Sequence, residues 1–311
     1  MRYVVITGAN GFLGSHLARR LVEDGIRVLA IDREACNTNL PKSQLISFQP
    51  CEMQSLDQFV PPEGKPDIFY HFAWQGVAPE HREDFGMQYE NVTYCLNAVR
   101  LAARMGAKKF VSPGSTMEYL GAAEPIDAAT RPAADNAYGC AKIAGRFLCQ
   151  ALCQDLGIRF IYAVIASMYG IGREDNNVIF YVMRSLVAQQ RPSLTKMEQR
   201  WDYIHILDAA DALYKIGCLE FPSSFYSIGN GDNLPLKEYV FMIRDLIDPL
   251  LPLGIGEIPY KNGSLSHSMI NPSALFQDTG FRPTIPFAQG IREVIDDYRR
   301  RNCDSGQDVG I

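Results

Sequence analysis

The sequence lacks the features that mark secreted, metal-binding and membrane proteins. Its eight cysteines form no Cys-x-x-Cys pair, and their scatter from Cys36 to Cys303 is typical of reduced thiols in a cytosol. Its five histidines show neither the His-x-x-x-His nor the Cys/His spacing of a zinc site, so we expect no metal. No apolar run approaches the roughly 18 residues that a membrane span needs, and the apolar start is too short for a signal peptide. We therefore expect a cytoplasmic protein with no membrane partner.

A surplus of positive charge is also missing. The 311 residues carry a formal net charge of -5, which argues against nucleic acid as a partner. Hydrophobic residues make up 47% of the chain and charged residues 21%. These proportions are ordinary for a globular protein of one large or two modest domains.

What the chain does have is a regular alternation of apolar runs and helical segments in its first half. The apolar runs are 3–7, 28–31, 45–48, 68–72, 110–111 and 160–165, and the helical segments include 13–23, 87–104 and 138–155. This order predicts parallel strands with crossover helices on both faces. Residues 1–168 are therefore expected to form an α/β, Rossmann-type doubly wound parallel sheet.

The regular alternation of strands and helices ends after Tyr169. Helices are predicted at 178–189 and 208–218 and strands at 203–206 and 225–228, and seven prolines from 235 to 286 divide the remainder into short pieces. We expect a smaller mixed α/β lobe over residues 169–301 that covers the carboxyl edge of the sheet. A flexible polar tail is expected at 302–311.

A glycine-rich segment directly follows the first strand. Gly8-Ala-Asn-Gly11-Phe-Leu-Gly14 opens a helix, where glycines allow a tight turn and let the backbone approach a pyrophosphate. Asp32 ends the second strand, 18 residues after Gly14, where a carboxylate can accept both hydroxyls of an adenosine ribose. These residues predict a dinucleotide site. Asp32 would repel a 2′-phosphate and favours NAD, whereas Arg33 could bind that phosphate or stack on adenine, so NADP stays open.

Tyr138 and Lys142 lie four residues apart and therefore share one face of a predicted helix. A free phenol has a pKa of about 10, so proton transfer near neutrality requires neighbouring positive charge, which Lys142 and an oxidised nicotinamide can supply. Ser115 lies 23 residues before Tyr138, just after the strand-like segment 109–112. The three side chains predict a proton-transfer site beside the cofactor.

These motifs and their order resemble the extended short-chain dehydrogenase/reductase family, specifically its nucleotide-sugar epimerases, reductases and dehydratases. The resemblance runs to about Arg300. It rests on the Gly-x-x-Gly-x-x-Gly opening, His71-Phe-Ala-Trp74, Asn91-Val, Ser115, Tyr138-x-x-x-Lys142, Tyr169-Gly170 and Asp202-Tyr-Ile-His205. It implies an NAD(P)-dependent enzyme that binds a nucleotide-diphosphate sugar, mainly in the lobe at 169–301.

The resemblance also implies a role for each matched residue. Tyr138 is the expected acid/base, Lys142 holds the nicotinamide ribose and lowers the phenol pKa, and Ser115, assisted by Thr116, hydrogen-bonds the reacting sugar oxygen. The expected cofactor-binding residues are Gly8, Asn10, Gly11, Phe12, Leu13, Gly14, Asp32, Arg33, Glu52, Ala73, Asn91, Tyr138 and Lys142. The expected substrate-binding residues are Trp74, Thr116, Ser167, Asn177, Arg200 and Trp201. For Asn177 a helix N-cap is the alternative, and for Trp74 a packed core side chain.

Several positions depart from the family pattern. The family's 4,6-dehydratases carry an Asp-Glu pair directly after the hydroxyl residue, where this chain has Thr116 and Met117. Methionine cannot exchange a proton, so we do not expect a 4,6-dehydratase. Glu118 comes one residue late and is expected to be structural. Trp201 stands where the family commonly has an arginine, so diphosphate binding would fall to Arg200, Arg173 or Arg184.

Two enzymatic functions remain open from the sequence. An epimerase would oxidise the sugar C4 to a ketone and return the same hydride to the opposite face, and Asp32 favours this function. A 4-keto-deoxysugar nucleotide reductase would use the same three residues once, and the altered substrate lobe favours it. A cofactor-sensing regulator without catalysis would not need Tyr138 and ranks third.

The family commonly forms homodimers through two long helices, which correspond here to residues 87–104 and 138–155. We therefore expect a homodimer with a four-helix contact. Cys95 and Cys149 are expected to pack in that interface.

Overall fold

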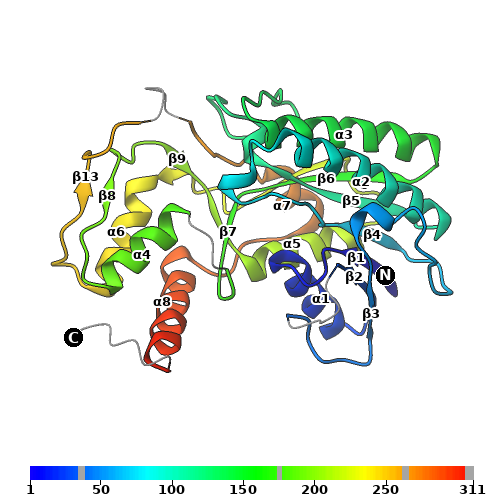
Figure 1. Ribbon diagram of the computed structural model, residues 1–311, viewed down its shortest axis with the longest axis horizontal. Helices are drawn as coiled ribbons and strands as arrows, with labels where there is room; N and C mark the ends of the chain where they lie inside the picture. Colours follow the sequence, from blue (N-terminus) through cyan, green and yellow to red (C-terminus); the bar gives the residue numbers. More distant parts are fainter. Residues whose placement is uncertain (34–38, 174–176, 261–265, 305–311) are drawn as a thin grey trace.

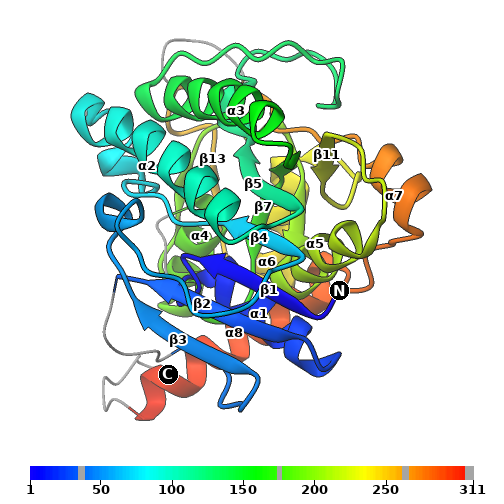
Figure 2. The same ribbon diagram turned by 90° about the vertical axis from the view of Figure 1, so that its right-hand side faces the viewer.

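A seven-stranded parallel sheet forms the centre of the fold, as seen in a computed structural model that describes residues 1–33, 39–173, 177–260 and 266–304. The strand order is β11-β6-β5-β4-β1-β2-β3. Strands β1 to β6 are labelled in Figure 1 and β11 is labelled in Figure 2. The strands are β1 (Tyr3–Thr7), β2 (Arg27–Asp32), β3 (Ile46–Pro50), β4 (Ile68–His71), β5 (Lys109–Ser115), β6 (Arg159–Ile165) and β11 (Phe225–Ile228). Every residue of β1 and β4 is buried, because helices cover both faces of a doubly wound sheet.

Two pairs of helices cover the sheet. On one face α1 (Phe12–Glu23) packs against α5 (Ile206–Cys218), and on the other α2 (Phe85–Arg104) packs against α3 (Ala137–Asp155) (Figure 2). Side chains before α2 and α3 fix their first turns, because Asp84 accepts the Met87 N–H over 3.0 Å and Asn136 accepts the Gly139 N–H over 2.8 Å. The predicted Rossmann-type sheet is confirmed.

The order of the strands reverses between β1 and β4, which lie side by side although β2 and β3 come between them in sequence. Ligands bind doubly wound sheets at the carboxyl ends of the strands beside such a reversal. The glycine loop follows β1, Trp74 follows β4 and Ser115 ends the neighbouring β5. The topology therefore brings the predicted cofactor and catalytic segments to one edge.

A second hydrophobic cluster lies beyond that edge. It is built mainly from α4 (Val178–Val187), α6 (Leu236–Ile247) and α8 (Phe287–Asp304), with Tyr169 and Tyr203 from the strands beneath them. The remaining elements are short: β7 (Ser167–Tyr169), β8 (Ser193–Leu194), β9 (Arg200–Trp201), β10 (Tyr203–His205), β12 (Leu234–Pro235), β13 (Gly254–Ile255), α7 (Ser273–Thr279) and the 3-10 helices η1 (Met53–Ser55), η2 (Pro79–His81) and η3 (Thr116–Glu118).

The boundary at residue 168 stays a prediction. Although α5 and β11 come after it in sequence, both pack into the core of the main sheet. Helix α8 runs to Asp304, past the predicted start of the tail, and residues 305–311 lie outside the described residues. Within the part of the chain that is described, no helix is both long and apolar enough to cross a membrane.

Candidate active site

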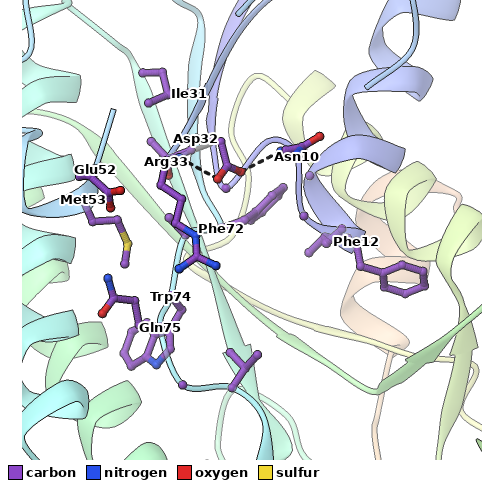
Figure 3. A pocket seen from close by; sticks show the side chains of 18 of the residues that line it. Asn10, Phe12, Ile31, Asp32, Arg33, Glu52, Met53, Phe72, Trp74 and Gln75 are labelled. Carbon is purple, nitrogen blue, oxygen red and sulfur yellow. Dashed lines mark hydrogen bonds between the residues drawn. The ribbon is translucent and has the colours of Figure 1, made fainter. Parts of the chain in front are cut away.

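A cavity of about 690 Å³ lies at the carboxyl ends of β1, β2 and β4, within the size range of small-molecule sites. Ten of the predicted cofactor-binding residues line it: Gly8, Asn10, Gly11, Phe12, Leu13, Gly14, Asp32, Arg33, Glu52 and Ala73. Trp74 lines its far side, next to Gln75 (Figure 3). The structure thus brings segments between residues 7 and 87 together around one cavity.

The glycine loop passes too close to its neighbours for larger residues. Gly8 has φ +69°, and a Cβ there would lie 2.6 Å from the Ala73 amide nitrogen. Gly11 is the N-cap of α1 and has no side chain to cap the first amide groups. These amides and the positive end of the helix dipole suit a pyrophosphate.

The Asp32 carboxylate is fixed at the end of β2. It accepts the Asn10 N–H over 2.9 Å and the Arg33 N–H over 2.8 Å, and both bonds are drawn in Figure 3. A carboxylate oxygen has two lone pairs, so each oxygen can still accept a ribose hydroxyl. The exposed Arg33 side chain extends into the space between Asp32 and Gln75 in Figure 3. The groups present fit the adenosine end of a dinucleotide.

Tyr138 and Lys142 lie in the first two turns of α3 and are both buried, with 8% and 6% of their surfaces exposed. The Lys142 ammonium donates a hydrogen bond to the Pro113 carbonyl oxygen on β5 over 3.2 Å. It lies 5.8 Å from the centre of the Tyr138 ring, and the Arg82 guanidinium lies at the same distance from that ring. Burying a lysine is costly unless it has partners. A buried lysine beside a buried tyrosine is therefore uncommon, and such positions are candidates for a functional site.

Ser115 is held at the end of β5 by a capping box. Its hydroxyl accepts the Met117 N–H over 3.2 Å, and the Glu118 carboxylate accepts the Ser115 N–H over 2.6 Å. Helix α3 approaches this turn closely, because a Cβ on Gly139 would lie 2.6 Å from the Met117 carbonyl oxygen. Glycine at this position therefore lets the helix that carries Tyr138 pack against the turn that carries Ser115.

Glu118 is fully buried beneath this turn. The same oxygen that accepts the Ser115 N–H also accepts the Tyr162 hydroxyl over 2.7 Å, whereas the other oxygen has no hydrogen-bond partner among the described residues. Burial raises the pKa of Glu118 to about 7, against the opposing effects of these hydrogen bonds and of the Lys142 and Arg146 charges. The support it gives to Ser115 agrees with the structural role expected from its position.

The predicted substrate residues fall into separate places. The Trp201 indole N–H donates to the Ser167 hydroxyl over 2.8 Å, so these two lie together. Thr116 is buried and accepts a hydrogen bond from the Ser268 hydroxyl over 2.8 Å. The structure thus links η3, which follows Ser115, to the segment that pairs with Trp201.

Asn177 and Arg200 have local roles in the described structure. Asn177 is the N-cap of α4 and accepts the Phe180 N–H over 3.2 Å, which confirms the alternative considered for it. Arg200 is exposed and donates to the Asn233 carbonyl oxygen over 3.0 Å. A role in binding a diphosphate stays a prediction for both.

Asn91 supports the cavity rather than lining it. Its side chain both donates to the Gln75 carbonyl oxygen and accepts the Gln75 N–H, each over 2.9 Å. Its neighbour Gln88, which sequence reasoning did not identify, holds the same loop through the Gly76 and His81 carbonyl oxygens. Gln88 lies one helical turn before Asn91 on α2, and nothing in the sequence around it indicated that it would hold this loop.

The segment at 202–205 also has a structural role. Asp202 is fully buried, accepts the backbone N–H groups of Asn230 and Gly231 over 2.9 and 2.6 Å, and has its pKa raised to about 7 by burial. His205 is the N-cap of α5. The segment therefore fixes the junction between β10, α5 and the loop after β11.

The expectation that Cys95 and Cys149 pack against a partner subunit is wrong. They are 2% and 1% exposed within a single chain, because these positions on α2 and α3 face inward. Among the described residues, no group of three or more His, Cys, Asp and Glu side chains is arranged to hold a metal ion.

Fold and site together define a Rossmann-type dinucleotide-binding protein with the Ser, Tyr and Lys of a short-chain dehydrogenase/reductase. A family model described as the NAD dependent epimerase/dehydratase family matches residues 4–223. The chain belongs to this family.

The proteins that this chain resembles are named for different reactions. The chain is 24% identical to GDP-6-deoxy-D-mannose reductase of Pseudomonas aeruginosa, covering 95% of this chain and 97% of the reductase. It resembles the structure of a UDP-N-acetylglucosamine 4-epimerase from Methanobrevibacter ruminantium M1 with a TM-score of 0.84 at 18% identity, covering 96% and 99% of the two chains. It also resembles an NAD-dependent NDP-hexosamine 5,6-dehydratase of tunicamycin biosynthesis, with a TM-score of 0.81 at 20% identity and coverage of 98% and 100%. The family is therefore established, and its members' reactions span epimerisation, reduction and dehydration.

Proposed function

We propose that the protein is an NAD-dependent nucleotide-sugar epimerase that acts through a transient 4-keto sugar by reversible hydride transfer. The observation that carries the proposal is the burial of Tyr138 and Lys142 together on α3, with Ser115 at the end of the adjacent β5. None of these three residues lines the cavity that holds the fixed carboxylate of Asp32, but Trp74 lines it and contacts both Tyr138 and Lys142.

NAD is the cofactor in the family's description, and the cavity residues fit it. The first amides of α1 would hold the pyrophosphate, Asp32 the adenosine ribose and Lys142 the nicotinamide ribose. When bound, NAD supplies a nicotinamide that accepts and returns a hydride. Arg33 keeps NADP as an alternative because its guanidinium can pair with a 2′-phosphate.

The protein's own groups would manage the proton. Tyr138 takes the C4 hydroxyl proton as the sugar carbon loses its hydride, and gives the proton back when the ketone is reduced. The Ser115 hydroxyl donates to the reacting oxygen and stabilises the charge that develops there. The Lys142 ammonium lies 5.8 Å from the centre of the Tyr138 ring and places a positive charge beside the site of proton transfer.

The substrate proposed is a nucleotide-diphosphate sugar. Ser167 on β7 and Trp201 on β9 would contact the nucleotide sugar. Thr116 and Asn177 complete the proposed set of substrate contacts. Arg200 is the proposed diphosphate contact, because its exposed guanidinium donates a single described hydrogen bond and a diphosphate needs a charge-assisted donor.

A 4-keto-deoxysugar nucleotide reductase is the second candidate. The altered substrate lobe favours it, because Trp201 stands where the family commonly has an arginine and donates a hydrogen bond to Ser167. The 24% identity to GDP-6-deoxy-D-mannose reductase supports the same candidate. A non-catalytic cofactor sensor ranks lower, since Ser115, Tyr138 and Lys142 are all present.

A 4,6-dehydratase is disfavoured in this proposal. Met117 cannot exchange a proton, and the neighbouring Glu118 is buried and bonded to the Ser115 backbone. The likeness to a 5,6-dehydratase means that elimination at another position has to be tested with the other reactions.

We also propose a homodimer through α2 and α3. Their outer faces carry exposed apolar side chains, which include Phe85 and Tyr89 on α2 and Phe147 and Leu148 on α3, exposed by 73, 74, 50 and 48%. Exposed apolar patches of this kind mark association surfaces. Light scattering on the wild type and on Phe147→Glu tests the dimer, and a monomeric wild type would reject it.

One experiment separates the candidate reactions. The purified protein is passed through gel filtration, its bound cofactor is identified, and it is then incubated with a panel of nucleotide sugars while C4 configuration is followed by NMR. Retained NAD(H) and inversion at C4 without added cofactor support the epimerase. Weak cofactor binding, with oxidation of added NAD(P)H by a nucleotide-linked 4-ketosugar, selects the reductase.

A further inference from the structure

Trp74 contacts both members of the catalytic pair. The Lys142 ammonium lies over its ring, 3.8 Å from the ring centre, which is well within the range of a cation–π contact. The Tyr138 ring meets the same indole edge to face, with centroids 6.0 Å apart and planes at 80°. The one hydrogen bond described for the ammonium goes to the Pro113 carbonyl oxygen. The indole therefore supplies the other main contact that offsets the burial of Lys142.

The indole itself is fixed by a hydrogen-bonded glutamine. Its N–H donates to the Gln88 side-chain oxygen over 2.9 Å. Gln88 is 1% exposed, and its amide nitrogen donates to the Gly76 and His81 carbonyl oxygens over 2.9 and 3.2 Å. The orientation of the ring thus depends on α2 and on the loop that follows β4.

We propose that Trp74 is a positioning residue that holds the Lys142 ammonium and the Tyr138 ring in their reactive arrangement. The proposal rests on the proposed function in one respect, which is that Tyr138 and Lys142 are taken as the residues that carry out the reaction. It replaces the expectation that Trp74 binds the substrate, because Lys142 already covers one face of its ring. A desolvated cation–π contact corresponds to a change on the order of thirtyfold in an equilibrium, which is large enough to affect turnover.

Two substitutions at this position separate the ring's electrostatic effect from its bulk. Trp74→Leu removes the aromatic face, whereas Trp74→Phe keeps a smaller aromatic face and loses the five-membered ring with its N–H. We expect Trp74→Leu to lower kcat about tenfold or more with little change in KM for the nucleotide sugar, and Trp74→Phe to recover most of the loss. A raised KM with kcat unchanged in Trp74→Leu would make Trp74 a substrate-binding residue and overturn the proposal.

A spectroscopic measurement tests the contact without any turnover. In protein labelled with ¹³C-lysine, the ring current of Trp74 should move the Lys142 ε-methylene protons upfield, and Lys142→Met identifies their signal by its loss. The shift should vanish in Trp74→Leu and persist in part in Trp74→Phe. A Lys142 signal at its ordinary position in the wild type would overturn the proposal, whether or not the protein epimerises sugars.

Gln88→Leu provides a second variant in case Trp74→Leu does not fold. It leaves the indole in place and removes its hydrogen bond, so a smaller upfield shift and a smaller loss of kcat are expected. An unchanged Lys142 shift together with unchanged kcat would show that Gln88 does not orient the ring, and would remove this support from the proposal. If a clear shift is present and no nucleotide sugar reacts, the positioning contact stands and the proposed function fails.

Discussion

The Glu118 carboxylate accepts the backbone N–H of Ser115 over 2.6 Å. This hydrogen bond joins a fully buried acid to the residue whose hydroxyl is proposed to contact the reacting sugar oxygen. Because the acid has a pKa raised from 4.5 to about 7, its protonation changes within the range where the enzyme is expected to work.

Glu118→Gln should flatten the pH dependence of stability. A folded-state pKa above the unfolded value means that the native state binds the proton more tightly, so this contribution to stability is complete below about pH 4.5 and is lost as the pH rises through about 7. The shift corresponds to about 3 kcal/mol. Urea unfolding at pH 5 and pH 8 measures the difference. The exposed Glu63→Gln is the control, and an equal pH slope in Glu118→Gln and wild type would contradict the prediction.

Tyr138→Phe should reduce turnover by about a hundredfold to ten-thousandfold, because it removes the proposed proton carrier and leaves the ring in place. Cofactor affinity, measured by calorimetry, should stay close to that of the wild type. Turnover equal to the wild type would reject the role assigned to the phenol.

Asp32→Asn should weaken NAD binding about tenfold, on the order of one lost charge-assisted hydrogen bond to a ribose hydroxyl. It should also improve binding of NADP, since the repulsion of a 2′-phosphate is removed. Dissociation constants for both cofactors check this, with Arg33→Ala as the companion variant. An unchanged preference in Asp32→Asn would mean that another residue selects the cofactor.

Gly139→Ala should cost about 1–3 kcal/mol and lower kcat, because its Cβ would lie 2.6 Å from the Met117 carbonyl oxygen and force α3 away from the Ser115 turn. Gly145→Ala is the matched control on the same helix. Its Cβ would come no nearer than 4.0 Å to Trp74, so stability should hold or rise by about 1 kcal/mol. Thermal unfolding and steady-state kinetics of both variants test this prediction. Equal stability and equal kcat in the two variants would count against the close approach of α3 to the Ser115 turn.

Asp202→Ala should destabilise the fold by about 2–4 kcal/mol, because it leaves the buried N–H groups of Asn230 and Gly231 without their acceptor. Asp202→Asn keeps one acceptor oxygen and should lose less. Denaturant titration measures both. A typical hydrogen bond contributes about 1 kcal/mol to stability. A loss smaller than about 1 kcal/mol in Asp202→Ala would therefore show that water takes the place of the carboxylate as acceptor.

The sequence predicted the parts of the molecule that local patterns determine. The glycine loop, Asp32 and the Tyr138–Lys142 spacing each specify a local geometry, and the strand and helix alternation specifies the sheet. The contacts that support the site are tertiary: Glu118 under Ser115, and Gln88 behind Trp74, join side chains from different elements. Cys95 and Cys149 were misplaced for a related reason, since helical spacing shows that residues share a face and does not show which way that face turns.

Strand β11 comes from residues 225–228 yet forms the edge of the main sheet next to β6. A protein cut after residue 168 would therefore leave β6 with a bare row of amide and carbonyl groups, which invites aggregation. The segment matched by the family model stops at residue 223, just before this strand. Attempts to express the two halves separately, or to graft the second half onto a related scaffold, should carry residues 206–228 with the first half.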